Sequence, residues 1–295
     1  MVDGRVVGLL LSLVAGLVGC VPFADLATLG VPLACLAGSV LRIRRAHVED
    51  AMAEAGVQSP GQSAWEMYAS LAAGIVELLW LAGAGRRDLS RVVRLDPDSQ
   101  TQLDEVFRKR DGAPPPAAVF GASHTGNWEL AACAMAARIP MSVLVKPVSL
   151  GVLDRFMTRV RARYGVGLIS GEGGLVEARR ELEAGRVVAL LVDQVPVREA
   201  NGDWLPFLGR AALTDRAPAA LAATVGCPFV VTASRRDANG EHWLHVLSVK
   251  RPPARGRARW IEAATREATM ELAAFVERHP DQWLWLHRRW RDALQ

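Results

Sequence analysis

The 295-residue sequence is poor in cysteine, tyrosine and lysine, and these scarcities exclude several classes of protein. Its four cysteines include no Cys-x-x-Cys pair, which excludes a disulfide-rich scaffold, a zinc ribbon and a thioredoxin-like redox centre. With two tyrosines and a net charge of +4, the chain lacks the stacking platforms and the basic excess of a nucleic-acid-binding protein. We therefore expect no nucleic-acid partner. The hydrophobic share of 51% excludes a disordered chain.

Arginine takes the place of lysine, since only three of the 35 basic residues are lysines. This bias is typical of a GC-rich genome. It also suits recognition of phosphate or carboxylate groups, which the planar guanidinium binds bidentately. The two explanations are compatible, so arginines near a reactive site are candidates for anion binding.

The N-terminal region is almost free of charge, because residues 6–41 contain one charged residue, Asp25. Prolines divide the region into two apolar pieces, each shorter than the roughly 20 residues that a simple membrane span requires. Arg5 precedes the region and Arg42 follows it, which favours a cytoplasmic location for both flanks. We expect a helical hairpin that inserts into the inner leaflet of a membrane, with a single tilted span as the alternative.

Two other interpretations of this region stay open. Residues 17–20, Leu-Val-Gly-Cys, resemble the lipobox of bacterial lipoproteins, and in that case Cys20 would carry lipid and the protein would be periplasmic. The region could also form a pair of buried core helices. Our main expectation divides the chain into a hydrophobic membrane-anchoring segment, residues 1–41, and an α/β domain, residues 42–295.

Beyond residue 42, short apolar runs alternate with segments of helical periodicity. We expect strands at residues 117–121, 141–145, 187–192 and 229–233, and an edge strand at 243–249. We expect helices within residues 42–84 and at residues 95–110, 128–138, 150–163, 175–183, 214–225 and 260–278. This alternation predicts a single α/β domain with a mixed, mostly parallel sheet flanked by helices.

The first apolar run leads into a His-Thr-Gly-Asn-Trp-Glu string that starts at His124. On one continuous helix, His124 and Glu129 would be rotated apart by about 140°. They can meet if His124 lies on the turn before a helix and Glu129 lies in its first turn, where the helix N-terminus also favours negative charge. We expect Glu129 to orient His124 as a general base that deprotonates an attacking hydroxyl. A structural histidine beside an acid fits the same spacing.

Other chemistries fit this string less well. Ser123 misses the Gly-x-Ser-x-Gly nucleophile elbow by one residue. A metal site would need a third ligand, and the string contains no cysteine or further histidine. We therefore expect neither an acyl-serine intermediate nor a bound metal. Asn127 and Trp128 are expected to anchor the turn in the core.

Four sequence blocks together resemble the late lipid A acyltransferases, the lauroyl/myristoyl acyltransferase family. The string at residues 124–129 is similar to the family's H-(S/T)-G-N-W-E block. The others are residues 192–194, similar to its D-Q block, residues 206–210 with Thr214, similar to its P-F-F-G-R…T block, and residues 280–290, similar to its P-E-Q-(Y/W)-x-W-x-H-R-R-(W/F) block. The blocks follow the family order over roughly residues 40–290.

The resemblance implies a glycerol-3-phosphate-acyltransferase-like fold and a membrane-associated O-acyltransferase that needs no cofactor. Such enzymes transfer groups other than aminoacyl groups. They move a fatty acyl chain from acyl carrier protein or coenzyme A to a hydroxyl of a membrane lipid, here a lipid A precursor in lipopolysaccharide biosynthesis. By this analogy His124 is the base, Glu129 is its partner, and the catalytic domain faces the cytoplasm at the inner membrane. Leu208 stands where many members have phenylalanine, a change that concerns the acyl groove.

Three other functions stay open beside this one. Acylation of another glycolipid or phospholipid is the nearest alternative, because it would use the same fold and the same residues. A non-catalytic lipid-binding protein and a periplasmic lipoprotein lipidated at Cys20 are the more distant ones.

Four further residues are expected to bind substrate. The family has a basic residue before a glycine between its first two blocks, and here Arg161, before Gly165, is expected to bind a phosphate of donor or acceptor. Asp193 and Gln194 follow a predicted strand, at the edge of an α/β sheet where ligands bind, and the alternative is that they hold the catalytic turn. Arg210 is expected to face phosphate, with solvent as the alternative. The tryptophans of the closing block are expected to form a core seam, with the membrane interface as the alternative.

Overall fold

The computed structural model of the protein describes residues 4–83, 85–108, 116–146, 150–171, 173–196 and 199–290. Its central sheet contains β1 (Val93–Leu95), β2 (Ala118–Ala122), β3 (Met141–Leu144), β4 (Gly167–Ile169), β5 (Val187–Leu191), β8 (Phe229–Arg236) and β9 (His242–Lys250). The seven strands lie in the order β1-β9-β8-β2-β5-β3-β4. The β8–β9 pair is antiparallel and the other neighbouring pairs are parallel. The predicted mixed, mostly parallel sheet is confirmed.

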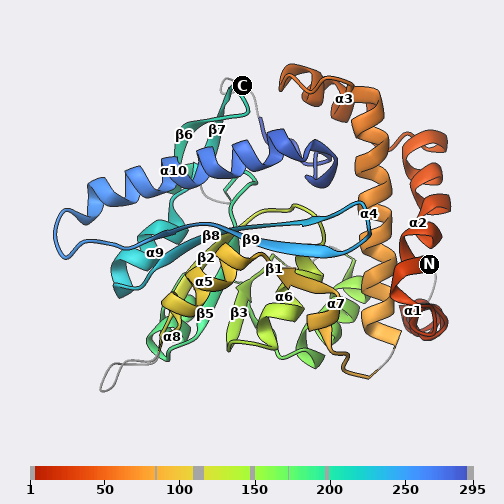
Figure 1. Cartoon of the computed structure of the whole chain (residues 1–295), viewed down its shortest axis with the longest axis horizontal. Helices are drawn as coiled ribbons and strands as arrows, with labels where there is room; N and C mark the ends of the chain where they lie inside the picture. The colour runs from red at the N-terminus through yellow and green to blue at the C-terminus, as the bar shows by residue number, and fades with distance from the viewer. Residues whose placement is uncertain are drawn as a thin grey trace.

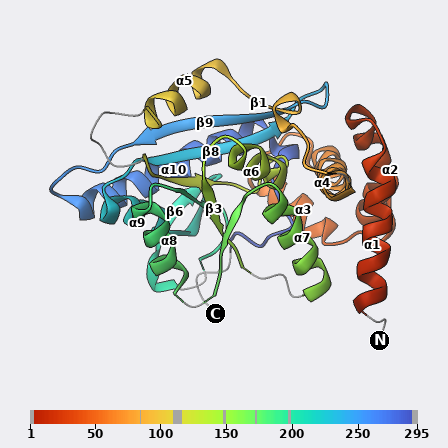
Figure 2. The ribbon, with the colours of Figure 1, turned by 90° about the horizontal axis from the view of Figure 1, so that it is seen from below.

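Helices cover both faces of this sheet (Figures 1 and 2). They are α3 (Arg45–Glu54), α4 (Pro60–Gly83), α5 (Pro97–Val106), α6 (Trp128–Ala136), α7 (Gly151–Arg163), α8 (Gly174–Glu183), α9 (Ala217–Val225) and α10 (Arg257–Arg278). Successive side chains of a strand point to opposite faces. In β2, Val119 accordingly belongs to a buried cluster with residues of α8, α9 and α10, whereas Ala118 and Phe120 belong to a second cluster with residues of α5, α6 and α7.

Some elements differ from those that we predicted. The strand expected at the sheet edge, β9, is covered by β1, which has only three residues and therefore shows no periodicity in the sequence. β6 (Gly202–Phe207) and β7 (Arg210–Asp215) form an antiparallel hairpin, so the helix expected from residue 214 begins at Ala217. The hairpin turn holds Leu208 at a φ of 50° and Gly209 at 76°. Leu208 thus adopts the left-handed conformation at a position where such a turn usually has asparagine or aspartate.

The N-terminal region folds as two helices that pack on α4 (Figure 2). They are α1 (Gly4–Gly19) and α2 (Leu26–Cys35). The backbones of α2 and α4 approach so closely that a Cβ on Gly30 would lie 2.8 Å from the backbone nitrogen of Ala73. Glycine permits this approach because it has no side chain. The two helices therefore rest directly on α4.

The opposite side of these two helices is apolar and exposed. Its exposed side chains include Leu9, Leu10, Leu13, Leu17, Leu29, Leu36, Val40 and Leu41. By length and composition, the helical stretches Phe23–Val40 and Pro60–Gly83 could each cross a membrane, and the second of them is the partly buried α4. A contiguous exposed apolar surface is typical of a membrane or protein interaction site. These apolar helices suggest membrane association.

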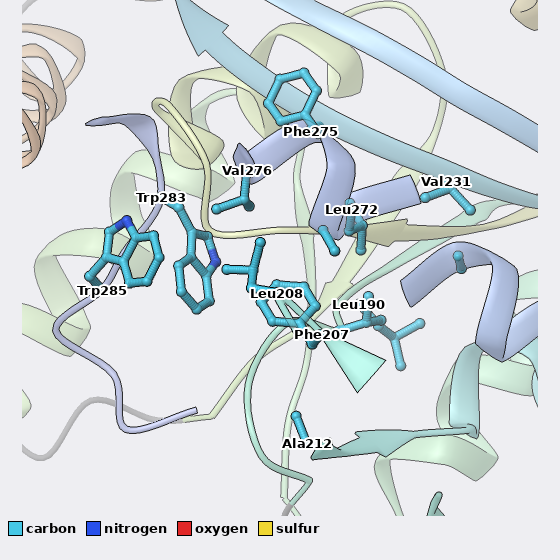
Figure 3. Packing of buried hydrophobic residues seen from close by; sticks show 14 of the residues in the cluster. Leu190, Phe207, Leu208, Ala212, Val231, Leu272, Phe275, Val276, Trp283 and Trp285 are labelled. Atoms are coloured by element: carbon cyan, nitrogen blue, oxygen red, sulfur yellow. The ribbon is translucent and has the colours of Figure 1, made fainter. Parts of the chain in front are cut away.

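The C-terminal block closes the core beside the β6–β7 turn. Trp283 and Trp285 are buried, and their ring centroids lie 4.8 Å apart. The Trp283 ring also lies 5.3 Å from that of Phe207, and Leu208 packs in the same cluster (Figure 3). The prediction of a core seam is confirmed for these two tryptophans.

Candidate active site

His124 lies on a tight turn between β2 and α6, as the sequence predicted. Gly126 in this turn has a φ of 57°, and a Cβ there would lie 2.8 Å from the carbonyl oxygen of Ser234, so that only glycine fits. The backbone N–H of Gly126 donates to the carbonyl of Gln282 at 2.8 Å, and that of Leu284 donates to the carbonyl of His124 at 3.1 Å. The turn is therefore held between β8 and the C-terminal block.

The carboxylate that pairs with His124 is Asp193. Its Oδ1 lies 2.9 Å from the ring Nδ1, and its Oδ2 accepts from the backbone N–H of His124 at 2.8 Å and from Trp283 Nε1 at 2.7 Å. Burial by itself would raise the pKa of Asp193, but the charge of His124 and these hydrogen bonds lower it below its usual range. An ionised carboxylate only accepts hydrogen bonds, so the imidazole carries its proton on Nδ1 and leaves Nε2 free to act as a base.

Glu129 lies in the first turn of α6, as predicted, but it does not orient His124. Its carboxylate accepts from Arg161 Nε at 2.8 Å and from Arg161 Nη2 at 2.5 Å. Burial would lower the pKa of Arg161, but the hydrogen bonds and charge of Glu129 raise it. The predicted His124–Glu129 contact was wrong, because α7 brings a guanidinium to Glu129 and a neighbouring strand brings Asp193 to His124.

Sheet order explains how Asp193 reaches the histidine. β2 and β5 are adjacent and parallel, with Ala122 paired to Leu191. Two residues beyond this pair, His124 and Asp193 leave the same edge of the sheet. The sequence marked both blocks as following strands, but it could not show that the two strands are neighbours. Asp193 thus contacts the His124 turn, as the alternative interpretation of this residue expected.

Two other side chains surround the imidazole. Gln194 Nε2 lies 3.3 Å from the free ring nitrogen, Nε2 of His124. The ring of Trp128 packs edge-on against the imidazole, with the centroids 5.0 Å apart. Asn127 anchors the turn, as predicted: its Oδ1 accepts from the backbone N–H of Leu130 at 3.0 Å and caps α6. The free nitrogen of His124 thus faces groups that a substrate hydroxyl can replace.

Arg210 lies apart from the residues that contact His124. Its guanidinium pairs with Glu54 at the end of α3 and lies 5.0 Å from the centre of the Trp290 ring. A carboxylate therefore occupies the place that we expected a phosphate to take. Of the four residues predicted to bind substrate, the structure brings Asp193 and Gln194 to His124 and places Arg161 on Glu129.

Arg289 is buried against the segment that carries Gln194, a role that our sequence interpretation did not give it. This side chain is 1% exposed, and burial lowers its pKa to about 10. It donates to the carbonyls of Gln194 and Leu213 and to the hydroxyl of Thr214. Arg289 and Trp283 both belong to the closing sequence block, which was the signal that could have identified them.

An apolar cavity lies beside the His124 turn, and its lining includes Ser123 and Trp128. A mainly apolar lining with a few polar groups is typical of small-molecule sites. Glu129 and Arg161 supply charged groups to the lining, and its apolar walls include Phe120, Ala131, Met135, Met141, Leu190 and Leu244. The described residues contain no group of three or more metal-ligating side chains. Such a cavity suits an alkyl chain whose polar end lies near His124.

The sequence was compared with known proteins. A family model described as bacterial lipid A biosynthesis acyltransferase matches residues 7–292, nearly the whole chain. Among curated proteins, none matches. The matched range includes the turn, the carboxylate that contacts it, the cavity and the C-terminal block.

Proposed function

This chain belongs to the bacterial lipid A biosynthesis acyltransferase family, whose members are acyltransferases, and we propose that it transfers a fatty acyl chain from a thioester of acyl carrier protein or coenzyme A to a hydroxyl of a lipid A precursor. The observation that carries this proposal is the His124–Asp193 pair beside an apolar cavity. The pair provides a base, and the cavity accommodates the acyl chain. The transfer needs no cofactor.

In the proposed reaction, His124 Nε2 takes the proton of the acceptor hydroxyl as its oxygen attacks the thioester carbonyl. The tetrahedral intermediate then collapses, the carbon–sulfur bond breaks, and the proton on His124 passes to the departing thiolate. Asp193 fixes the ring tautomer and stabilises the imidazolium that forms between the two steps. A substrate hydroxyl would replace Gln194 at the free ring nitrogen.

The Glu129–Arg161 pair serves the substrate in this proposal. Arg161 carries five N–H donors, of which two donate to Glu129, so the others can bind a phosphate of the donor or acceptor. Glu129 holds the guanidinium in the lining of the cavity and acts through it. An arginine held in this way binds an oxyanion with less loss of side-chain freedom.

The N-terminal helices serve as the membrane attachment in this proposal. Their exposed apolar face would insert into the inner membrane, so that the catalytic turn works on the cytoplasmic side. Arg42 and Arg44 follow this face and would meet anionic lipid head groups. A lipid acceptor would then reach the enzyme from the bilayer to which it is attached.

Transfer assays with purified protein test this function. We expect full-length protein to acylate a lipid A precursor from acyl carrier protein thioester, and we expect His124→Ala to lower the rate by about 10²–10⁴-fold, the usual contribution of a general base. His47→Ala is the matched control, because His47 lies on α3 away from the site. Lipid binding without turnover in the wild-type protein would contradict the proposal. Turnover only with another glycolipid or phospholipid would reassign the acceptor.

A further inference from the structure

A second buried carboxylate lies behind the catalytic turn and takes no part in the proposed reaction. Glu77 of α4 is 2% exposed. Its Oε1 accepts from Arg236 Nη2 at 2.7 Å and lies 3.1 Å from His242 Nε2, and its Oε2 accepts from Asn127 Nδ2 at 2.7 Å. One side chain thus joins α4 to the end of β8, the start of β9 and the residue before α6.

The charges of this cluster are balanced inside the protein. Burial would raise the pKa of Glu77, but the hydrogen bond and charge of His242, the charge of Arg236 and the hydrogen bond from Asn127 lower it. His242 Nδ1 is buried with no hydrogen-bond partner, so the ring contacts Glu77 through Nε2. Within the cluster, the Glu77 carboxylate and the Arg236 guanidinium form an ion pair. A buried ion pair is weak evidence for stability alone, because desolvation offsets its attraction.

The contact with Asn127 leads directly to the active site. An asparagine amide can point either way, and Glu77 selects one orientation because a carboxylate accepts only from the NH₂ group. With Nδ2 on Glu77, the oxygen Oδ1 faces the backbone N–H of Leu130 and caps α6. α6 begins with Trp128, whose ring packs on His124, and with Glu129, which holds Arg161.

Arg236 provides a second route to the same turn. Its backbone N–H donates to Gln282 Oε1 at 3.1 Å. The carbonyl of Gln282 in turn accepts from the backbone N–H of Gly126 at 2.8 Å. The side chain of Arg236 is held by Glu77, so Gly126 and Asn127, which follow His124 in the turn, both connect to this carboxylate.

From these contacts we propose that Glu77 is a positioning residue for the acyl transfer reaction. Acting through Asn127 and Arg236, it holds the turn and the start of α6 so that His124 and Trp128 keep their places beside Asp193 and the cavity. The inference rests on the function proposed above, and it extends that function to a residue outside the four sequence blocks.

The main test is a double variant, Glu77→Gln with Arg236→Met, which removes both buried charges together. We expect kcat to fall about 10–100-fold, the cost of a misplaced reacting group, while KM for the acyl donor changes little. Hydrogen exchange at the amides of Gly126 and Leu130 should speed up in the same variant. The exchange measurement does not need turnover, so it tests the positioning even if the proposed function fails.

Asp96→Asn is the matched control. Asp96 also caps a helix, through the N–H of Ser99 at 3.0 Å, and also pairs with a histidine, His245, at 3.0 Å, but its helix is α5. This control should lose stability without losing kcat per folded molecule. If the double variant behaves like the control, with kcat and exchange at the turn unchanged, Glu77 only stabilises the fold and the proposal is wrong.

A milder variant decides the question if the double variant does not fold. Asn127→Ser keeps an oxygen that can cap α6 but removes the amide that Glu77 holds, and it leaves the Glu77–Arg236 ion pair in place. We expect this variant to fold, to lower kcat and to leave KM for the donor nearly unchanged. A wild-type kcat would overturn the proposal.

Discussion

Two carboxylate–histidine pairs among the described residues, Asp193–His124 and Glu77–His242, look alike and differ in what surrounds the second ring nitrogen. In the Asp193–His124 pair, this nitrogen, Nε2, lies beside Gln194, and the histidine side chain is 14% exposed. In the Glu77–His242 pair, the second nitrogen is sealed in the core, and the side chain is 2% exposed. Access to the second nitrogen, and not the pairing itself, separates a candidate base from a structural histidine.

The largest effect that tests this comparison is expected for Asp193→Asn. An amide in this place can present its NH₂ group to Nδ1 and favour the wrong tautomer, so we expect kcat to fall on the order of 10³–10⁴-fold. Steady-state kinetics of the purified variant measure this loss. A wild-type rate would show that Asp193 does not orient His124.

An intermediate effect is expected for Glu129→Gln. This change weakens a bidentate, charge-assisted contact to Arg161, so we expect a loss of about 10–100-fold in kcat/KM. Because Glu129 contacts Arg161 and Asp193 contacts His124, the loss of kcat should be smaller than in Asp193→Asn. Steady-state kinetics of both carboxylate variants, measured side by side, separate the two roles. A loss of kcat as large as that of Asp193→Asn would restore Glu129 as the partner of His124.

A smaller effect on activity is expected at the second pair. His242→Gln keeps an amide that can donate to Glu77 but removes the packing of the imidazole ring. Because the Glu77–Arg236 ion pair and the Asn127 contact stay in place, we expect the free energy of unfolding to fall by about 1–3 kcal/mol, while kcat stays close to that of the wild type. Denaturant unfolding and an activity assay measure the two quantities. A loss of kcat as large as that of His124→Ala would remove the distinction between the pairs.

The smallest effect concerns acid stability. The pKa of Glu77 is lowered from its ordinary value of 4.5 in the folded protein, so this pair contributes stability that is present above that pH and lost as the pH falls through the folded pKa. Glu77→Gln with Arg236→Met removes this contribution. The unfolding free energy of the double variant should therefore fall less steeply below about pH 4.5 than that of the wild type. Equal slopes would show that Glu77 is not ionised in the fold.

Much of the architecture was predictable, because apolar runs indicate buried strands and helical periodicity indicates helices. The parallel strands around β2 and the helices that flank them were expected near the right residues. The short strands and the Leu208 turn were not, since three residues show no period and a left-handed leucine is rare. Each of these misses concerns a local conformation that tertiary packing imposes.

The candidate site was predictable only in part. Family resemblance indicated His124, Asp193 and Gln194, which the fold brings together. The partner of His124 depends on which strand lies next to β2. This long-range contact cannot be inferred from the spacing of residues within one sequence block. The sequence did not indicate a role for Glu77. A single acidic residue in an apolar helix can be interpreted only from its contacts, here with Arg236 and Asn127.

The contacts of the catalytic turn also determine when the enzyme can become active during its synthesis. The turn donates a hydrogen bond to the carbonyl of Gln282 and accepts one from the N–H of Leu284, and both residues are synthesised long after α1 and α2. A ribosome adds about 5–20 residues per second, so the apolar helices emerge roughly tens of seconds before the residues that complete the turn. A nascent chain can therefore reach a membrane while its base is still unformed. Acyl transfer would begin only after the last block is released.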